Sequence, residues 1–161
     1  INKVSDLKEL QGLFHMYDDL MIQEFMNGTE YGADVYIDFI SGKCTSIFLK
    51  EKIKMRAGET DKSISVKDTK LFKSIISFVE EAGFRGMIDI DIFKIGEEWY
   101  FSEVNPRFGG GYPHAYECGV NIPILVLNNL KGEENKVAMG YYSEGIVMMK
   151  YNEVMIKDIR S

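Results

Sequence analysis

The stretch that decides the fold covers residues 89–112 and reads DIDIFKIGEEWYFSEVNPRFGGGY. Residues 87–95 and 99–104 are two largely apolar runs around Gly96-Glu97-Glu98, and they predict two antiparallel strands. Asp91 and Glu103 are twelve positions apart on these strands. An odd-numbered tight loop centred on Glu97 pairs the two carboxylates on one face, whereas an even loop splits them. We expect the first arrangement.

Asn105 lies two positions beyond Glu103 and therefore points to the same face of the strand. Carboxylate and amide oxygens at this spacing suit Mg²⁺ or Mn²⁺. Arg107 is one further alternation along, where a guanidinium can bind a planar anion through two hydrogen bonds. Gly109-Gly110-Gly111 then gives a loop whose backbone N–H groups can approach an anion. On pattern alone, the alternative is equally weighted: the carboxylates face water and the glycines only turn the chain.

The rest of the chain supplies short helices and further strands. Helical spacing of apolar residues predicts helices over 5–17, 68–82, 113–118 and 121–130, with Asp68 as an N-cap and Gly83 as a C-terminal stop. Alternating or compact apolar runs predict strands over 20–25, 31–40 and 44–52, of which the last two form a hairpin with one wet face. Residues 145–151 and 153–159 predict a final strand pair, and the polar residues 53–67 a mobile loop. The fold class is α+β, one unit of mainly antiparallel sheet with helices packed on one side.

Composition excludes several classes of protein. The 161 residues carry 19 basic and 25 acidic side chains, a net charge of −6 that disfavours nucleic acid as a partner. No apolar run is long enough for a membrane span. Cys44 and Cys118 fit reduced thiols in a cytoplasmic protein better than a disulfide or zinc site. The chain opens at Ile1 without an initiator Met, and we expect it to be a fragment.

Two further segments have the chemistry of a nucleotide site. Residues 23–26 end a predicted strand whose backbone groups can bind an adenine edge, while Glu30 can accept hydrogen bonds from ribose hydroxyls. A plain strand, turn and strand is the favoured alternative for that segment. Lys50, Lys52, Lys54 and Arg56 share a face of an extended chain and would form one row of cations for phosphates. Here the alternative is a solvated edge strand protected by lysines.

Taken in this order, the features resemble the C-terminal half of an ATP-grasp domain, the nucleotide-binding fold of carbamoyl-phosphate synthase large subunits, biotin carboxylase and related carboxylate-amine ligases. The resemblance rests on residues 23–32, 50–59, 86–107 and, less specifically, 109–123. Its specific part is the E-x-N-P-R pattern at 103–107 with Asp91 upstream, and FGGGYPHAYECGVNIP is similar to the carbamoyl-phosphate-synthase-like branch.

The resemblance implies a role for each candidate residue. It implies ATP as the cofactor, with Mg²⁺ or Mn²⁺, and Arg107 at the reacting acyl phosphate. Adenine would lie on Glu24, Phe25 and Met26, and ribose on Glu30. Phosphates would lie on Lys50, Lys52 and Arg56, and metal on Asp91, Glu103 and Asn105. Asp91 departs from the family, which uses Glu or Gln there. The family's upstream lysine strand, glycine-rich lid and substrate domain have no counterpart here, so residues 1–161 would be a partial domain that is inactive in isolation.

The predicted function is an ATP-dependent ligase that forms an acyl phosphate from a small carboxylate or bicarbonate and passes it to an amine or ammonia. Phosphoryl transfer needs positioning and charge neutralisation, so no catalytic nucleophile is assigned among the cysteines and histidines. Two alternatives stay open: a non-catalytic ATP-grasp-like module, and a hydrolase with Asp91 and Glu103 as an acid–base pair. Tyr141 and Tyr142 are consistent with a homo-oligomer interface.

Overall fold

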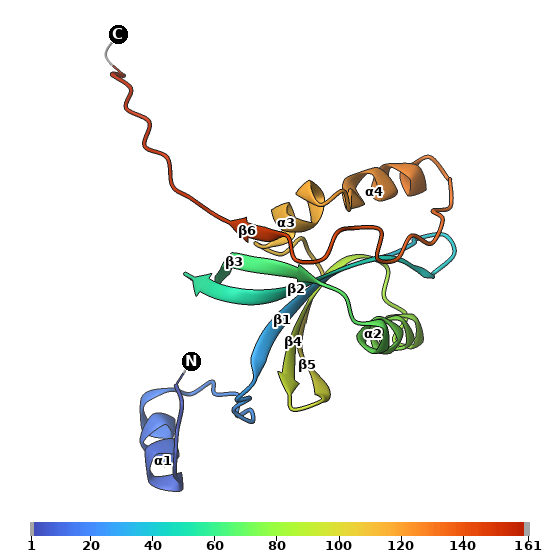
Figure 1. The fold of residues 1–161 in the computed structure, drawn as a ribbon. Coiled ribbons are helices and arrows are strands. Elements are labelled where there is room, and N and C mark those ends of the chain that lie inside the picture. The colour runs from blue at the N-terminus through green and yellow to red at the C-terminus, as the bar shows by residue number, and fades with distance from the viewer. Residues whose placement is uncertain (1, 160–161) are drawn as a thin grey trace.

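The protein is built on one six-stranded antiparallel sheet, seen in a computed structural model that describes residues 2–159 (Figure 1). The strand order is β5-β4-β1-β2-β3-β6. The strands are β1 (Thr29–Ile37), β2 (Cys44–Arg56), β3 (Glu59–Val66), β4 (Gly86–Ile95), β5 (Glu98–Asn105) and β6 (Val147–Met149). The helices are α1 (Leu7–Met16), α2 (Thr69–Glu81), α3 (Tyr112–Glu117) and α4 (Ile122–Leu130). The predicted α+β fold with a mainly antiparallel sheet is confirmed.

Helix α2 closes the main hydrophobic core. Asp68 caps its first turn by accepting a 2.8 Å hydrogen bond from the Leu71 backbone, and Gly83 ends it with a φ of 73°. The buried stripe of α2 contains Leu71, Ile75 and Val79 and packs on one face of the sheet against alternate residues of β1, β2 and β4. Both predicted helix ends are therefore confirmed.

The opposite face of the sheet is also covered, which corrects two predictions. Tyr36 of β1 packs with Ile122 of α4, and Phe48 of β2 packs with Ala115 of α3. Helices therefore lie on both faces, not on one side (Figure 1). The face of β1 expected to be wet is buried, because Asp34, Tyr36 and Asp38 are each 0 % exposed.

The polar segment 53–67 is not a loop. Strand β2 continues to Arg56, and a two-residue turn of Ala57 (φ 51°) and Gly58 (φ 78°) leads into β3, because Arg56 pairs with Glu59. Positive φ at both central residues is the geometry of tight hairpin turns. The polar side chains misled the prediction because β3 buries polar groups: Thr60, Ser63 and Ser65 are at most 4 % exposed.

Two predicted strands are wrong. Residues 20–25 form no strand and lie in an irregular segment before β1. In the last region only β6 forms, paired with β3, and residues 153–159 leave the body of the protein as an exposed segment (Figure 1). Helix α1 is confirmed but has no buried residue. Among the described residues, none of the helices has the length and apolarity to span a membrane.

Candidate functional site

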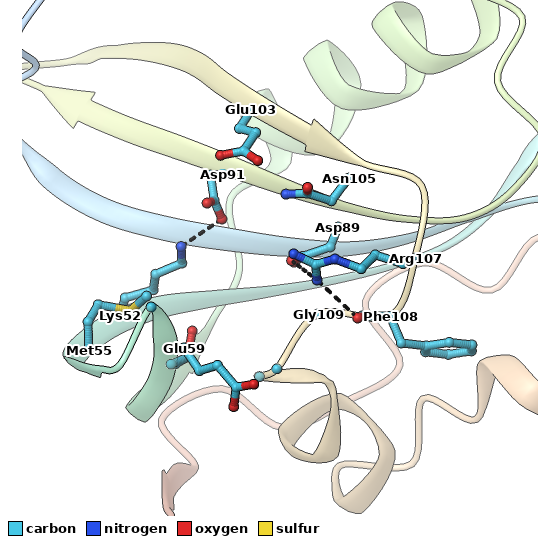
Figure 2. Close-up of a pocket in the computed structure, with 14 residues that line it drawn as sticks. Lys52, Met55, Glu59, Asp89, Asp91, Glu103, Asn105, Arg107, Phe108 and Gly109 are labelled. Carbon is cyan, nitrogen blue, oxygen red and sulfur yellow. Dashed lines mark hydrogen bonds and ion pairs between the residues drawn. The ribbon is translucent and has the colours of Figure 1, made fainter. Parts of the chain in front are cut away.

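A cavity of about 450 Å³ lies beside the strand pair β4–β5, on the face opposite α2 (Figure 2). Its walls come from the end of β2, the start of β3, the paired strands β4 and β5, and the segment after β5. The lining includes three acidic residues of β4 and β5, one amide, two cations and the glycine run: Asp89, Asp91, Glu103, Asn105, Lys52, Arg107 and residues 109–111. The structure thus brings residues of the E-x-N-P-R motif at 103–107 into one cavity with Lys52, one of the four predicted phosphate-binding cations.

The predicted pairing of Asp91 with Glu103 is confirmed, although the predicted route to it is wrong. The loop is even, with Gly96 and Glu97 between the paired residues Ile95 and Glu98. An irregularity in the ladder restores the pairing, because Ile92 faces Phe101 while its neighbour Asp91 faces Glu103, leaving Ser102 as the extra residue of a β-bulge.

The bulge has a physical reason. Phe101 packs in the core beneath α2, whereas Glu103 lines the cavity on the opposite face. Residues two apart in a regular strand share a face, so both environments cannot be met without an extra residue. Asn105 then pairs with Asp89, and both side chains line the cavity.

Lys52 connects three strands at the edge of the cavity. Its ammonium donates to Asp91 Oδ1 at 2.6 Å and to Glu30 Oε1 at 2.6 Å (Figure 2 shows the contact with Asp91). Burial lowers the pKa of Lys52, but the hydrogen bonds that it donates to the two carboxylates outweigh burial and leave the pKa above its usual value. Lys52 is therefore a cation, and three of the predicted site residues are in direct contact.

Lys50 lies deeper than predicted, in a buried ion pair with Asp34 beneath the glycine run. Lys50 is 1 % exposed and Asp34 0 %, and the Lys50 ammonium bonds Asp34 Oδ2. Within residues 2–159, Asp34 Oδ1 has no hydrogen-bond partner. A Cβ at Gly111 would lie 2.8 Å from Lys50 Cε, so the loop rests directly on the lysine stem. Lys50 itself does not line the cavity.

Asp89 is a site residue that the sequence reasoning did not assign. Its Oδ2 lies 3.8 Å from Arg107 Nη1, and a Cβ at Gly109 would meet its carboxylate (Figure 2). Burial raises the pKa of Asp89 to about 6. The alternation of Asp89 and Asp91 was a usable signal, because residues two apart on a strand face the same way. Arg107 is 59 % exposed and donates to the Phe108 carbonyl at 3.1 Å.

The four cations do not form one row, so that prediction is wrong. The β2–β3 ladder shifts register between Lys52 and Lys54 and again between Lys54 and Met55. Met55 therefore lines the cavity where a lysine was expected. Arg56 points elsewhere: its Nε lies 3.3 Å from Asp61 Oδ1, and its Nη2 donates to Asn152 at 2.9 Å.

The predicted adenine segment does not line the cavity. Glu24, Phe25 and Met26 lie in an irregular segment, and Phe25 is 59 % exposed with the Lys3 ammonium 3.8 Å from its ring centre. Glu30 does not line the cavity and is connected to it through its ion pair with Lys52. Adenine and ribose roles for these residues stay predictions.

The side-chain oxygens on the β4–β5 wall of the cavity are of the type that hard divalent cations bind. Glu103 and Asn105 have no hydrogen-bond or ion-pair partner for their side chains within residues 2–159, and they offer carboxylate and amide oxygens on one wall. Asp91 faces Glu103 but is held by Lys52. Over the same residues, no three His, Cys, Asp or Glu side chains are gathered closely enough to hold a metal. The oxygen donors fit Mg²⁺, provided that Lys52 releases Asp91.

Neither cysteine is placed for covalent chemistry. Burial raises the pKa of Cys44 to about 12 and also raises the pKa of Cys118, so both thiols stay protonated near neutral pH. His114 is 2 % exposed, with its ring held between Ser63 Oγ at 2.8 Å and the Ile146 carbonyl at 3.1 Å. None of these side chains lines the cavity.

Two solved structures with a similar fold have longer chains than this one. N5-carboxyaminoimidazole synthetase from Staphylococcus aureus, complexed with ADP, is 16 % identical, with a TM-score of 0.64 over 82 % of this chain and 38 % of that chain. The biotin carboxylase domain of thermophilic 2-oxoglutarate carboxylase, bound to bicarbonate, is 14 % identical, with a TM-score of 0.57 over 78 % of this chain and 30 % of that chain. The chain thus spans well under half of either structure. None of the curated proteins matches this sequence.

A family profile identifies the chain more specifically than these structures do. The family described as "ATP-grasp in the biosynthetic pathway with Ter operon" matches residues 16–154. This range includes the whole sheet and every residue that lines the cavity. The chain therefore belongs to the ATP-grasp superfamily, as a member of this family.

Proposed function

We propose that this chain is the metal- and phosphate-binding part of an ATP- and Mg²⁺-dependent ligase that joins a carboxylate to an amine through an acyl phosphate. The observation that carries the proposal is the shared cavity wall: Asp91, Glu103 and Asn105 beside Lys52 and Arg107. Oxygen donors for a hard cation and nitrogen donors for phosphate are the two sets that phosphoryl transfer requires.

Each group has a task that follows from its chemistry. Asp91, Glu103 and Asn105 would hold Mg²⁺, which supplies charge neutralisation on phosphate oxygens when bound. Lys52 would bind a phosphate as a point charge, and the exposed Arg107 would bind the planar carboxylate or transferring phosphoryl group. These residues position reactants and neutralise charge, and the reaction needs no nucleophilic side chain.

Supporting observations come from the relatives. The Staphylococcus aureus synthetase was solved with ADP and the biotin carboxylase domain with bicarbonate. We extend a nucleotide and a small carboxylate or bicarbonate to this chain as substrates, with an amine or ammonia as acceptor. The carbamoyl-phosphate-synthase-like branch and a cytoplasmic location stay predictions.

The test is ATP turnover by the full-length polypeptide that carries this chain, measured as ADP formed with a pool of carboxylates and amines. Glu103→Gln keeps the shape of the side chain and removes its charge, while Arg107→Ala removes the anion-binding group. We expect either change to lower turnover at least 100-fold with unchanged thermal unfolding. Lys54→Met, an exposed change two residues from Lys52, is the matched control.

Near-normal turnover in both variants would contradict the assigned roles. Turnover without any divalent cation would instead favour the hydrolase alternative. Metal-dependent ADP binding without turnover on any pool would favour a non-catalytic module.

A further inference from the structure

The bridge made by Lys52 is the feature of the site with the clearest mechanical consequence. The Lys52 side chain is 4 % exposed and touches Asp91 and Glu30, which are 25 % and 30 % exposed, respectively. A lysine on β2 thereby joins carboxylates on β4 and β1. Of the three predicted metal ligands, only Asp91 has a side-chain partner within residues 2–159.

The path of the lysine across the sheet depends on a glycine. β1 lies between β2 and β4, so the Lys52 side chain has to cross β1 to reach Asp91. The crossing is made over Gly32, where a Cβ would lie 3.4 Å from Lys52 Cε and 3.0 Å from Lys50 Cε. Gly32 pairs with Asp91 on β4 and with Lys50 on β2. The space left by its missing side chain therefore lies between Asp91 and Lys50, next to the Lys52 stem. The missing side chain at Gly32 thus lets Lys52 reach the carboxylate of Asp91 on β4.

An ammonium and a divalent cation cannot both neutralise Asp91 without repelling each other at short range. Metal binding at Asp91 is therefore in competition with Lys52. When Asp91 binds a metal, the ammonium keeps Glu30 but loses one of its two carboxylate partners, and a second anion would restore the lost pairing of this buried charge. Phosphate oxygens of a nucleotide in the cavity are such an anion.

We propose that Lys52 is the resident counter-ion of Asp91, that a divalent cation displaces it, and that nucleotide phosphate receives the displaced ammonium. Metal and nucleotide binding are then positively coupled: each ligand removes an obstacle to the other. The inference rests on the proposed function, since it takes Asp91 as a metal ligand and the cavity as the phosphate site. It adds that a divalent cation binds this site more weakly in the absence of nucleotide than in its presence.

The first experiment measures Mn²⁺ binding without nucleotide, by the electron paramagnetic resonance signal of free Mn²⁺, on the full-length polypeptide. In Lys52→Met the uncharged side chain keeps the length of the stem and leaves Asp91 free. We expect Lys52→Met to bind Mn²⁺ at least tenfold more tightly than the wild type, because one charge-assisted hydrogen bond no longer competes. Lys54→Met removes a charge from the exposed neighbour on the same strand and is expected to change Mn²⁺ affinity less than twofold.

An equal or weaker Mn²⁺ affinity in Lys52→Met would overturn the inference, and so would an equal gain in Lys54→Met. If Lys52→Met fails to fold, the wild type decides. The ammonium of Lys52, which is 4 % exposed, is followed by ¹⁵N NMR while Mg²⁺ and ADP are added. We expect its signal to shift on binding, and an unchanged signal with Mg²⁺ and ADP demonstrably bound would refute displacement.

The two proposals fail in different ways. If the full-length polypeptide binds neither ADP nor ATP with Mg²⁺ at millimolar concentration, the proposed function fails. The Mn²⁺ comparison between Lys52→Met and wild type needs no nucleotide, and a gain there still supports the competition at Asp91. If nucleotide binds but Lys52→Met gains no Mn²⁺ affinity, only the coupling is wrong.

Discussion

Gly109→Ala tests why three glycines follow the E-x-N-P-R motif at residues 103–107. The backbone of Gly109 does not need a left-handed φ, so the effect of a methyl group there is steric. Its Cβ would lie 2.5 Å from Asp89 Cγ and 2.7 Å from Oδ1, well inside the ordinary contact distance of about 3.4 Å. Overpacking of this kind costs about 1–3 kcal/mol, because the loop or the carboxylate has to move.

The assay is urea unfolding of four proteins: wild type, Gly109→Ala, Asp89→Ala and the double variant. Asp89→Ala opens the space and loses only an ion pair with a largely exposed guanidinium, so by itself it should change stability by less than about 1 kcal/mol. In that background Gly109→Ala should cost less than about 0.5 kcal/mol, which gives a coupling energy of about 0.5 kcal/mol or more.

Gly12→Ala is the control for the substitution itself. Gly12 lies inside α1 with nothing within 4 Å of an added Cβ, so alanine should be neutral or gain up to about 1 kcal/mol. The same cost for Gly109→Ala with and without Asp89, or no cost in either background, would refute the steric account. The glycines would then be present for the approach of an anion alone.

Three further predictions concern stability. Asp38 is buried and accepts hydrogen bonds from Ser41, Asn129 and Asn135, and Asp38→Ala should cost about 2–4 kcal/mol in urea unfolding, since these part-buried donors lose a charged acceptor. Despite burial, those donors hold the pKa of Asp38 below its usual range. The stability that Asp38 contributes is therefore present above about pH 4 and is lost as the pH falls through the pKa of the folded state. Asp38→Ala should flatten the decrease of the unfolding free energy at acid pH. Burial and the nearby Lys50 lower the pKa of His114. Neutral His114 therefore stabilises the fold above about pH 6.5, and this contribution is lost on acidification. The melting temperature of His114→Gln should fall less with decreasing pH than that of the wild type, and an equal fall would contradict the prediction. Ala57 has a φ of 51°, so Ala57→Gly should leave the unfolding free energy unchanged or raise it by up to about 1 kcal/mol. Ala57→Val should lower the unfolding free energy by at least about 1 kcal/mol. Calorimetric melting of both variants measures these changes.

The sequence was sufficient where a local pattern was strong. Helix α2 was predictable because its apolar stripe, Asp68 cap and Gly83 stop all agree. The strand pair around Gly96 was predictable as well. The facing of Asp91 and Glu103 was predicted from an odd loop, whereas the structure has an even loop and reaches the pairing through the bulge at Ser102, which was not predicted. Bulges are decided by which residues the rest of the fold buries, and here the core needs Phe101 while the cavity takes Glu103.

Polar residues caused the main errors. Strand β3 looks like a loop in sequence because its buried residues are Thr, Asp and Ser. Partners of these side chains are distant in the chain: Ser63 bonds His114, and Ser65 bonds the Ser143 carbonyl. Likewise, the cationic run looked like one row until register shifts turned Arg56 toward Asp61. Local hydrophobicity cannot report a hydrogen bond made 51 residues away.

By itself, the sequence determined the chemical types at the site and the strands that hold them, because E-x-N-P-R and the upstream Asp91 follow the two-residue repeat of a strand. Only the tertiary structure decided which charges meet. Asp89 reaches Arg107, Lys50 is buried against Asp34, and Lys52 crosses Gly32 to Asp91. Those contacts depend on strand order and register across the sheet, which place residues from distant parts of the chain a few ångströms apart.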